Sequence, residues 1–211
     1  MTIRDDYPQP LPVPGEIILA STSAARIEML TKAQVPFTSS PARIDEDTVK
    51  QSLLAENAAP RDIADALAEL KALRISAKHP AALVIGSDQV ADLAGTLLSK
   101  PSDMAAAEAQ LRLLRGKTHD LFSAVVIAQN GRPLWRHIGR ARLTMRPFSD
   151  RFLSDYLNQI GDEALHTVGS YKIEQSGVTL FSRIEGDHFT ILGMPLIEVL
   201  NHLMQIGAIP K

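Results

Sequence analysis

Hydrophobic positions recur with two different periods along this chain, and the changes of period predict its elements. A short apolar run predicts a buried strand over residues 16–20. Apolar positions three and four residues apart then predict a helix over 24–34, which Val35-Pro36 ends. Ser23 stands directly before this helix and is the expected N-cap residue.

One apolar stripe predicts a second helix over residues 60–78. The stripe consists of Ile63, Leu67, Leu70 and Leu73. Lys71 and Arg74 lie off this stripe, so the ordinary interpretation of each is a solvated basic side chain.

The rest of the chain predicts three more helices and several hairpins. Helices are expected over 103–114, capped by Ser102 and ended by Gly116, then from 149 or 150 to 160, and from Pro195 onward. Strands are expected over 83–90, 90–93, 96–99, 121–128, 134–138, 140–146, 171–174 and 178–184. Alternating strands and helices followed by hairpins predict an α/β fold with a mixed β-sheet flanked by helices.

A carboxylate and a lysine flank one of the predicted hairpins. An apolar strand delivers Asp88, and the chain returns after Ala94-Gly95 to Lys100. A three-residue loop with a left-handed glycine would set Asp88 opposite Lys100, whereas a two-residue loop would set Lys100 opposite Gln89. Either register keeps the acid and the base within one strand spacing, where the carboxylate stays ionised and can accept a proton. A structural salt bridge is the alternative interpretation.

The first strand leads through a serine-rich turn into the first helix. Ser21 and Ser23 stand in this turn, and Arg26 lies in the first helical turn. Free backbone N–H groups and the positive end of the helix dipole meet there, an arrangement that binds phosphate. The alternative is an ordinary capped helix with a surface arginine.

Composition narrows the class of protein. The 211 residues are 45% hydrophobic and 22% charged, which is enough for one sizeable core. The net charge of -2, without a basic block, argues against a nucleic-acid groove, and no apolar run approaches a membrane span. The absence of cysteine excludes disulfides and fits a cytoplasmic location. Closely spaced prolines predict a flexible tail over 1–14, ahead of a single bilobed domain over 15–211.

An ordered series of short motifs runs across the chain. It comprises Leu19-Ala-Ser-Thr-Ser-Ala-Ala-Arg-Ile-Glu-Met-Leu30, Asp45-Glu46, Leu67-Ala-Glu-Leu-Lys71-Ala, Gly86-Ser-Asp88, Ser99-Lys100-Pro101, Leu114-Arg-Gly-Lys-Thr-His119, Gly169-Ser-Tyr-Lys-Ile-Glu-Gln175, Arg183-Ile-Glu-Gly186 and Gly193-Met-Pro-Leu196. With this series the chain resembles the Maf family of nucleoside triphosphate pyrophosphatases from about residue 16 to the C-terminus. It departs from the family pattern at Ala24, Ser99 and Gln175, where the family has proline, glycine and glycine.

The resemblance implies a two-lobed Maf/ITPase-like fold with a central cleft. It also implies hydrolysis of nucleoside triphosphates to monophosphate and pyrophosphate, a housecleaning of nucleotide pools. Asp88 would be the general base, and Lys100 and Arg26 would clamp the phosphates. Ser21 and Ser23 would hold the terminal phosphates.

A polyanionic substrate in an acidic protein also calls for a divalent cation, Mg²⁺ or Mn²⁺. Glu46, within the acidic run 45–47, is the candidate ligand, and a solvated acidic loop is the alternative. Lys71 is a secondary candidate for a phosphate contact. His119 falls at a family position, but we expect a strand-end histidine whose ring is satisfied by the backbone.

Three family positions that sort substrates correspond here to Ala25, Gln89 and Glu174. Gln89 together with Glu174 resembles the branch that acts on 7-methyl-GTP, not the branch that acts on dTTP and UTP. A carboxylate can accept from guanine N1–H and N2–H and favours the cationic ring of 7-methylguanine. Alternatively, Lys172, two residues away on the same face of the predicted strand, pairs with Glu174.

Two other functions stay open on the sequence alone. One is a nucleotide-binding regulator of cell division and septum formation that needs no turnover, and the other is a hydrolase of a different phosphoanhydride, such as a nucleotide sugar. The leading hypothesis is the nucleoside triphosphate pyrophosphatase, for which we expect a small-molecule nucleoside triphosphate as the partner. We expect no nucleic acid and no membrane, and a homodimer is the candidate assembly.

Overall fold

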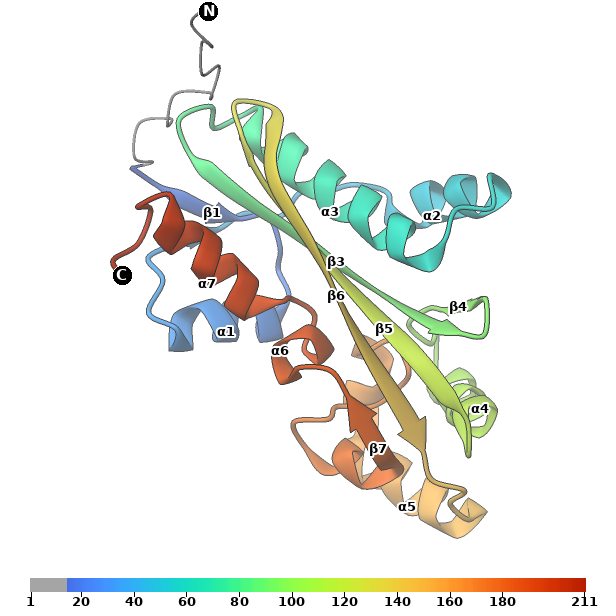
Figure 1. Ribbon diagram of the computed structural model, residues 1–211. Helices are drawn as coiled ribbons and strands as arrows, with labels where there is room; N and C mark the ends of the chain where they lie inside the picture. The colour runs from blue at the N-terminus through green and yellow to red at the C-terminus, as the bar shows by residue number, and fades with distance from the viewer. Residues whose placement is uncertain (1–14) are drawn as a thin grey trace, which may run out of the picture.

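The computed structural model describes residues 15–211, in which one twisted sheet carries helices on its faces (Figure 1). The expected tail over 1–14 lies outside the described residues. The strands are β1 (Ile17–Leu19), β2 (Thr38–Ser39), β3 (Leu83–Leu93), β4 (Thr96–Leu98), β5 (Thr118–Gln129), β6 (Arg132–Met145) and β7 (Phe181–Glu185). The α-helices are α1 (Ala24–Lys32), α2 (Glu46–Ala55), α3 (Pro60–Ser76), α4 (Met104–Leu114), α5 (Asp150–Ile160), α6 (His188–Ile191) and α7 (Leu196–Gln205), and the 3₁₀ helices are η1 (Gly161–His166) and η2 (Ser176–Leu180).

The sheet is mixed, as predicted. Its order is β2-β1-β3-β5-β6-β7, and β4 pairs with β3 beside that path. β1 runs parallel to β2 and β3, and the other pairs are antiparallel. On one edge of β3, β1 pairs with 83–85 and β4 with 91–93, while β5 follows the opposite edge over 84–92. Within the described chain, residues 86–90 therefore have no strand partner on the first edge, and Asp88 lies in this gap.

The β3–β4 hairpin has a two-residue loop. Leu93 pairs with Thr96, and Ala94 and Gly95 between them have φ values of 51° and 90°. Two consecutive positive φ angles define the tight turn whose twist suits a hairpin. Of the two loop lengths considered from the sequence, the structure has the two-residue one, but β4 ends at Leu98, so Lys100 pairs with neither Gln89 nor Asp88.

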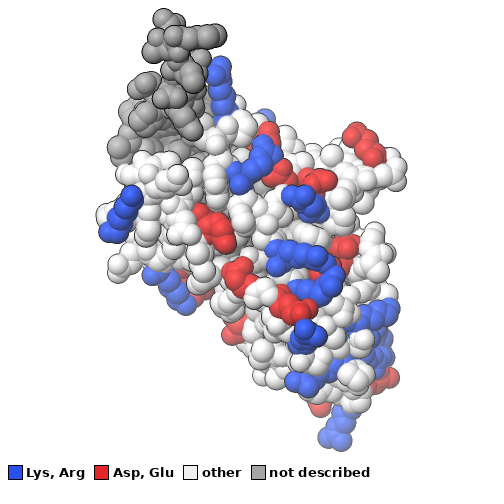
Figure 2. Space-filling model, viewed as in Figure 1, with Lys and Arg blue, Asp and Glu red and all other residues white. Residues whose placement is uncertain are grey.

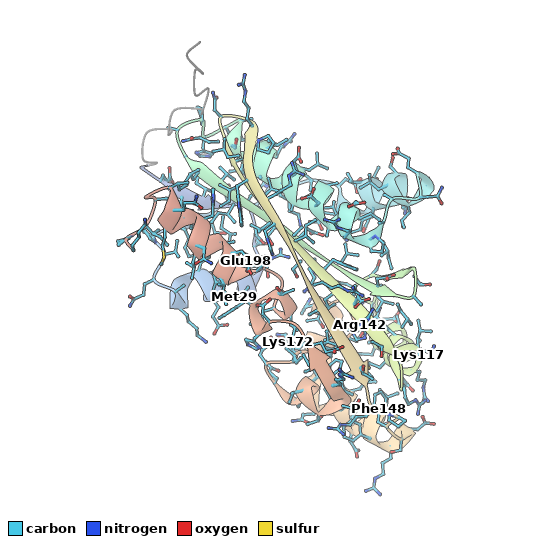
Figure 3. The ribbon with its side chains drawn as sticks, in the orientation of Figure 1. Met29, Lys117, Arg142, Phe148, Lys172 and Glu198 are labelled. Carbon is cyan, nitrogen blue, oxygen red and sulfur yellow. The ribbon has the colours of Figure 1, made fainter. Side chains whose placement is uncertain are left out.

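Long strands join two separately packed halves (Figure 1). In one half α1 and α7 pack on one face of the sheet and α3 packs on the other, around cores that include Leu30 and Leu67. In the other half α4 and α5 pack around a core that includes Leu111. Met29 and Phe148, labelled in Figure 3, belong to these different halves. The central cleft between the halves stays a prediction.

Gly86 sets the distance between α3 and β3. A Cβ atom built there would lie 2.2 Å from the Ala68 carbonyl oxygen and 2.5 Å from the Ala72 nitrogen. Any side chain at this position would push the helix off the strand. The close approach brings Lys71, on the same stretch of α3, down onto β3.

Several element boundaries differ from the prediction. The strands expected over 134–138 and 140–146 form one continuous β6, because β5 pairs along nearly its whole length. Gly139 continues that strand where an added Cβ would lie 2.4 Å from Thr190 Oγ1, so the glycine accommodates a close neighbour and does not end the strand. The segment 171–174 is a loop and turn, not a strand, and α4 is capped by Asp103, which accepts from the Ala106 N–H at 2.8 Å, and not by Ser102.

The short elements β2, α2 and α6 were not predicted. α2 begins at the acidic run 45–47, for which a solvated loop was the alternative interpretation. Asp45 caps the helix by accepting from the Thr48 N–H at 3.1 Å, and Glu46 and Asp47 stand in its first turn. Carboxylates at a helix N-terminus interact favourably with the helix dipole, so the same run was a helix start.

The visible surface mixes charges of both signs, with no large field of one sign (Figure 2). This agrees with the small net charge of -2. No helix in residues 15–211 is both long enough and apolar enough to cross a membrane.

Candidate active site

The centre of the candidate site is a buried lysine between two carboxylates. The Lys71 ammonium lies 2.6 Å from Asp88 Oδ1 and 2.8 Å from Glu46 Oε1. Asp88 comes from the gap in β3, Lys71 from α3 and Glu46 from the start of α2, so one cation joins three elements. The Lys71 and Asp88 side chains are 9% and 6% exposed, that of Glu46 40%. Lys71 occupies the position beside Asp88 that the hairpin argument gave to Lys100. The interpretation of Lys71 as a solvated basic side chain was wrong.

The two carboxylates differ in what remains open to a ligand. Burial acts to raise the pKa of Glu46, but the Lys71 ammonium, helped by Lys50 and Arg26, outweighs burial and holds that pKa below its ordinary value. Asp88 engages Lys71 through Oδ1, and its buried Oδ2 accepts no hydrogen bond within the described residues. A buried carboxylate oxygen is costly to leave unpaired, so Oδ2 is a position for a water, an ion or a ligand.

Arg26 is a second buried cation near these carboxylates. Its Nε donates to the Gly193 carbonyl at 2.9 Å, and its Nη1 donates to Ser21 Oγ at 3.4 Å. Burial lowers the pKa of the guanidinium, and the charges of Asp88 and Glu46 oppose this effect. The side chain is therefore not the surface arginine of the alternative interpretation.

The turn between β1 and α1 leaves polar groups available. Ser23 is the N-cap residue, as predicted, but its side chain makes no capping hydrogen bond. Ser21 Oγ accepts from the Ser23 N–H at 3.2 Å, and the Ser21 carbonyl accepts from Ser39 Oγ at 2.6 Å. Ala25 is half-buried in the first turn of α1. A helix start without a side-chain cap keeps the N–H groups that an anion would use.

Gln89 lies on the sheet face opposite Asp88, because successive strand residues alternate. Its Nε2 donates to Ser123 Oγ at 2.9 Å and to the carbonyls of Thr190 and Ile191 at 3.1 and 3.0 Å. The amide nitrogen thus anchors α6 to β3 and β5.

Lys100 and Glu174 lie on exposed segments. Lys100 is in the loop between β4 and α4, and Glu174 is in the turn before η2. Lys172, labelled in Figure 3, forms its ion pair with Glu163. The alternative in which Lys172 pairs with Glu174 was therefore wrong.

His119 belongs to the core of the second half. It is buried, its Nε2 lies 2.7 Å from the Tyr171 hydroxyl, and its ring is not satisfied by the backbone as expected. Burial lowers the pKa of His119 to about 4 against the opposing charge of Asp120, so the ring is neutral at pH 7. Its role is to hold the Tyr171 segment.

The Glu46 carboxylate fits a cation that arrives with a substrate. No group of three or more His, Cys, Asp or Glu side chains in residues 15–211 could by itself hold a metal ion. Mg²⁺ is commonly bound through one or two carboxylates together with substrate phosphates. The partly exposed Glu46 carboxylate can supply such a ligand.

A separate concavity of about 480 Å³ lies on the open sheet face of the second half. It is lined by Asp92, Ala94, Thr118, Asp120, Arg142, Thr144, Arg183 and Glu185. Asp120 accepts from both Arg140 and Arg142, so the charges there are largely balanced, and Figure 3 labels Arg142 on this face. The concavity contains none of the site residues described above.

Comparison with known proteins gives a match over nearly the whole described chain. A family model described as Maf-like protein matches residues 16–206. A Roseobacter denitrificans protein named nucleoside triphosphate pyrophosphatase is 54% identical over 94% of this chain and 100% of its own length. A Caulobacter vibrioides protein of the same name is 50% identical over 92% of this chain and 96% of its own. A Brucella abortus protein named 7-methyl-GTP pyrophosphatase is 45% identical over 89% of this chain and 94% of its own length.

Replacing Lys71 should destabilise the fold in a pH-dependent way. Lys71→Met leaves Asp88 and Glu46 without their shared counter-ion, which should cost about 3 kcal/mol or more at pH 7. In the wild type Glu46 has a lowered pKa, so its stabilisation is complete above the unfolded pKa and is lost as pH falls through the folded pKa. In the variant, acidification instead relieves the unpaired carboxylates, so the difference between the two proteins should narrow towards pH 4.

Urea unfolding at pH 7 and at lower pH measures this difference. Lys32→Met is the matched control, because Lys32 pairs with Glu28 at 2.6 Å on the exposed surface of α1. The control should lose less than about 1 kcal/mol. An equal, pH-independent loss in both variants would contradict the buried charge cluster.

Proposed function

The chain belongs to the family of Maf-like proteins, as its motifs predicted, and on that basis we propose that it hydrolyses a nucleoside triphosphate to the monophosphate and pyrophosphate. The observation that carries this proposal is the unpartnered Oδ2 of Asp88, buried near the two cations Lys71 and Arg26. The names of the Roseobacter and Caulobacter relatives support the reaction. Housecleaning of nucleotide pools is the corresponding role.

The chemistry is chiefly electrostatic. The triphosphate repels an incoming oxygen, so its charge must be neutralised while a water molecule loses a proton. In the proposal Asp88 Oδ2 takes that proton, because Lys71 occupies only Oδ1. The water oxygen forms a bond to phosphorus, the anhydride between the α- and β-phosphates breaks, and the monophosphate and pyrophosphate leave.

The cations and the first turn of α1 bind the phosphates. Arg26 has a planar guanidinium that can grip two oxygens, and the Lys71 ammonium has a third N–H beyond those that face Asp88 and Glu46. Ser21, Ser23 and the helix N–H groups hold the terminal phosphates. Lys100 closes over the triphosphate from the exposed loop after β4.

Glu46, together with the substrate phosphates, would hold a divalent cation, Mg²⁺ or Mn²⁺. Such an ion would neutralise phosphate charge and polarise the phosphoryl oxygens. Glu46 suits this role because Lys71 keeps it ionised and leaves it partly exposed.

We propose that Glu174 recognises the base and that 7-methyl-GTP is the preferred substrate. The Brucella relative carries the name 7-methyl-GTP pyrophosphatase. Glu174 is exposed, and its neighbour Lys172 forms an ion pair with Glu163, so the Glu174 carboxylate is available to a ligand. Ala25 and Gln89 contribute to specificity in this proposal, Gln89 through the position of α6.

Pyrophosphate release from a panel of triphosphates, with and without metal, tests the function. We expect release that needs Mg²⁺ or Mn²⁺ and stops in excess chelator. Glu46→Ala should raise the Mg²⁺ concentration for half-maximal rate by about tenfold or more. Glu56→Ala, at the exposed far end of α2, is the control and should leave it unchanged. Full activity in excess chelator would refute the requirement for a divalent cation. Nucleotide binding without pyrophosphate release would favour the alternative function, a nucleotide-binding regulator of cell division.

Replacing Glu174 should change the ranking of substrates. For the wild type we expect kcat/KM to be highest for 7-methyl-GTP among 7-methyl-GTP, GTP, CTP, UTP and dTTP. Glu174→Gln should lower the 7-methyl-GTP value by about 10–100-fold, the worth of a charge-assisted hydrogen bond, with a smaller effect on dTTP. Glu185→Gln, on exposed β7, should keep the wild-type ranking. A wild type that prefers dTTP, or an unchanged ranking of substrates in Glu174→Gln, would show that Glu174 does not recognise the base.

A further inference from the structure

Gln110 on α4 joins two loops that are far apart in the sequence. Its Nε2 donates to the Ser99 carbonyl at 2.8 Å, and its Oε1 accepts from Ser170 Oγ at 2.9 Å. Ser99 directly precedes Lys100, and Ser170 belongs to the segment that leads to Glu174. The two ends of one amide therefore hold the loop assigned to the phosphates and the loop assigned to the base.

The amide group suits this bridge better than any other side chain. One loop presents a carbonyl, which needs a donor, and the other presents a hydroxyl, which needs an acceptor. A carboxylate would repel the Ser99 carbonyl, and an apolar side chain would satisfy neither group. The bridge therefore needs a side chain that donates at one end and accepts at the other, as the Gln110 amide does.

The element that carries Gln110 is firmly held. Ala107, Leu111 and Leu114 are fully buried on the inner side of α4. Asp103 caps the start of the helix. A half-buried side chain on such a helix is a fixed reference point for loops that lack regular structure of their own.

The Ser170 side of the bridge is built with conformational strain. Ser170 has φ +59°, which serine seldom adopts, and its predecessor Gly169 has φ +88°. The Tyr156 hydroxyl donates to the Ser170 carbonyl at 3.4 Å, and Tyr171 is held by His119. These contacts fix the backbone so that the Ser170 hydroxyl meets Gln110 and the chain turns toward Glu174.

We propose that Gln110 is a positioning residue that sets the separation of Lys100 and Glu174, so that one nucleotide can engage both loops at once. The inference rests on the proposed function for the roles of those two residues. The bridge acts only on ligands that span both loops, because holding two contact groups at a fixed separation makes the second contact effectively intramolecular. A ligand that touches the phosphate side alone should not sense it.

Gln110→Met tests the proposal, with Gln129→Met as its matched control. Gln129 makes one comparable hydrogen bond, from Nε2 to the Ala81 carbonyl at 3.1 Å, in the other half of the molecule. In Gln110→Met we expect faster amide hydrogen exchange in both segments, 99–101 and 169–175, in the free protein. Gln110→Glu keeps an acceptor for Ser170 and loses the donor to Ser99, so exchange should rise mainly in 99–101. Gln129→Met should change neither segment.

The kinetic readout separates positioning from general structural damage. Gln110→Met should raise KM for the preferred triphosphate by about tenfold and leave kcat within about twofold. Inhibition by pyrophosphate, which reaches only the phosphate side, should change less than about threefold. Gln129→Met should leave KM and pyrophosphate inhibition at wild-type values.

The outcomes separate this inference from the proposed function. Unchanged exchange in both segments of Gln110→Met would overturn the bridge, even in an active enzyme. Two results would overturn the positioning role. One is faster hydrogen exchange with an unchanged KM, and the other is a weakening of pyrophosphate inhibition as large as the increase in KM. If the wild type releases no pyrophosphate, the proposed function is wrong, and hydrogen exchange alone still decides whether Gln110 couples the two loops.

Discussion

The arrangement of the site depends on one buried ammonium. An isolated charge in a protein interior is costly, so Lys71 is stable there only with carboxylates in contact. Asp88 supplies one from β3 and Glu46 the other from α2, and both lie within 2.8 Å of the ammonium. This requirement fixes where α2 begins relative to α3 and β3. It also leaves Asp88 with one engaged oxygen and one free oxygen, the property on which the proposed chemistry rests.

The gap in the edge of β3 leaves the Asp88 carboxylate near two cations that come from different faces of the sheet. Lys71 comes from α3 on one face of the sheet, and Arg26 comes from α1, which packs on the opposite face. A strand paired along both edges would separate these faces. Because β1 stops at Leu19 and β4 pairs only from Ala91, the middle of β3 is open on that side. The charges of Asp88 and Glu46 oppose the lowering of the Arg26 pKa by burial.

Local sequence signals predicted much of the fold. The helix α3, the mixed sheet and the choice of residues 94–95 as a turn follow from side-chain periodicity and turn chemistry, which are properties of neighbouring residues. The role of Lys71 could not be predicted in this way. The predicted stripe was wrong in its second half, because Leu70 is 40% exposed and Lys71 takes its place on the buried face with Leu67 and Ile75. Gly86, on a different element, lets this face approach β3 closely. The signal was present in Gly86-Ser-Asp88, but its effect on Lys71 depends on tertiary packing.

Other departures have the same origin. The segment 171–174 alternates like a strand, yet His119 and Gln110 hold its beginning in a turn through contacts that are distant in sequence. Gln110 itself sits in an ordinary helical pattern, and nothing local distinguishes it from a solvated glutamine. Among the site residues, Asp88, Arg26 and the two serines could be proposed from motif and spacing. The partners that fix them, Lys71 and the Gly193 carbonyl, required the fold.

The most direct test of the account is the comparison of turnover and nucleotide binding in Asp88→Asn. Asparagine keeps the shape and an oxygen acceptor for Lys71, but it cannot take a proton. The account predicts that kcat falls by about 10²–10⁴-fold while the Kd for the nucleotide changes only a few-fold. Asp92→Asn, four residues along the same face of β3, should retain the wild-type rate. A near wild-type rate in Asp88→Asn would contradict the claim that Oδ2 of Asp88 is the proton acceptor.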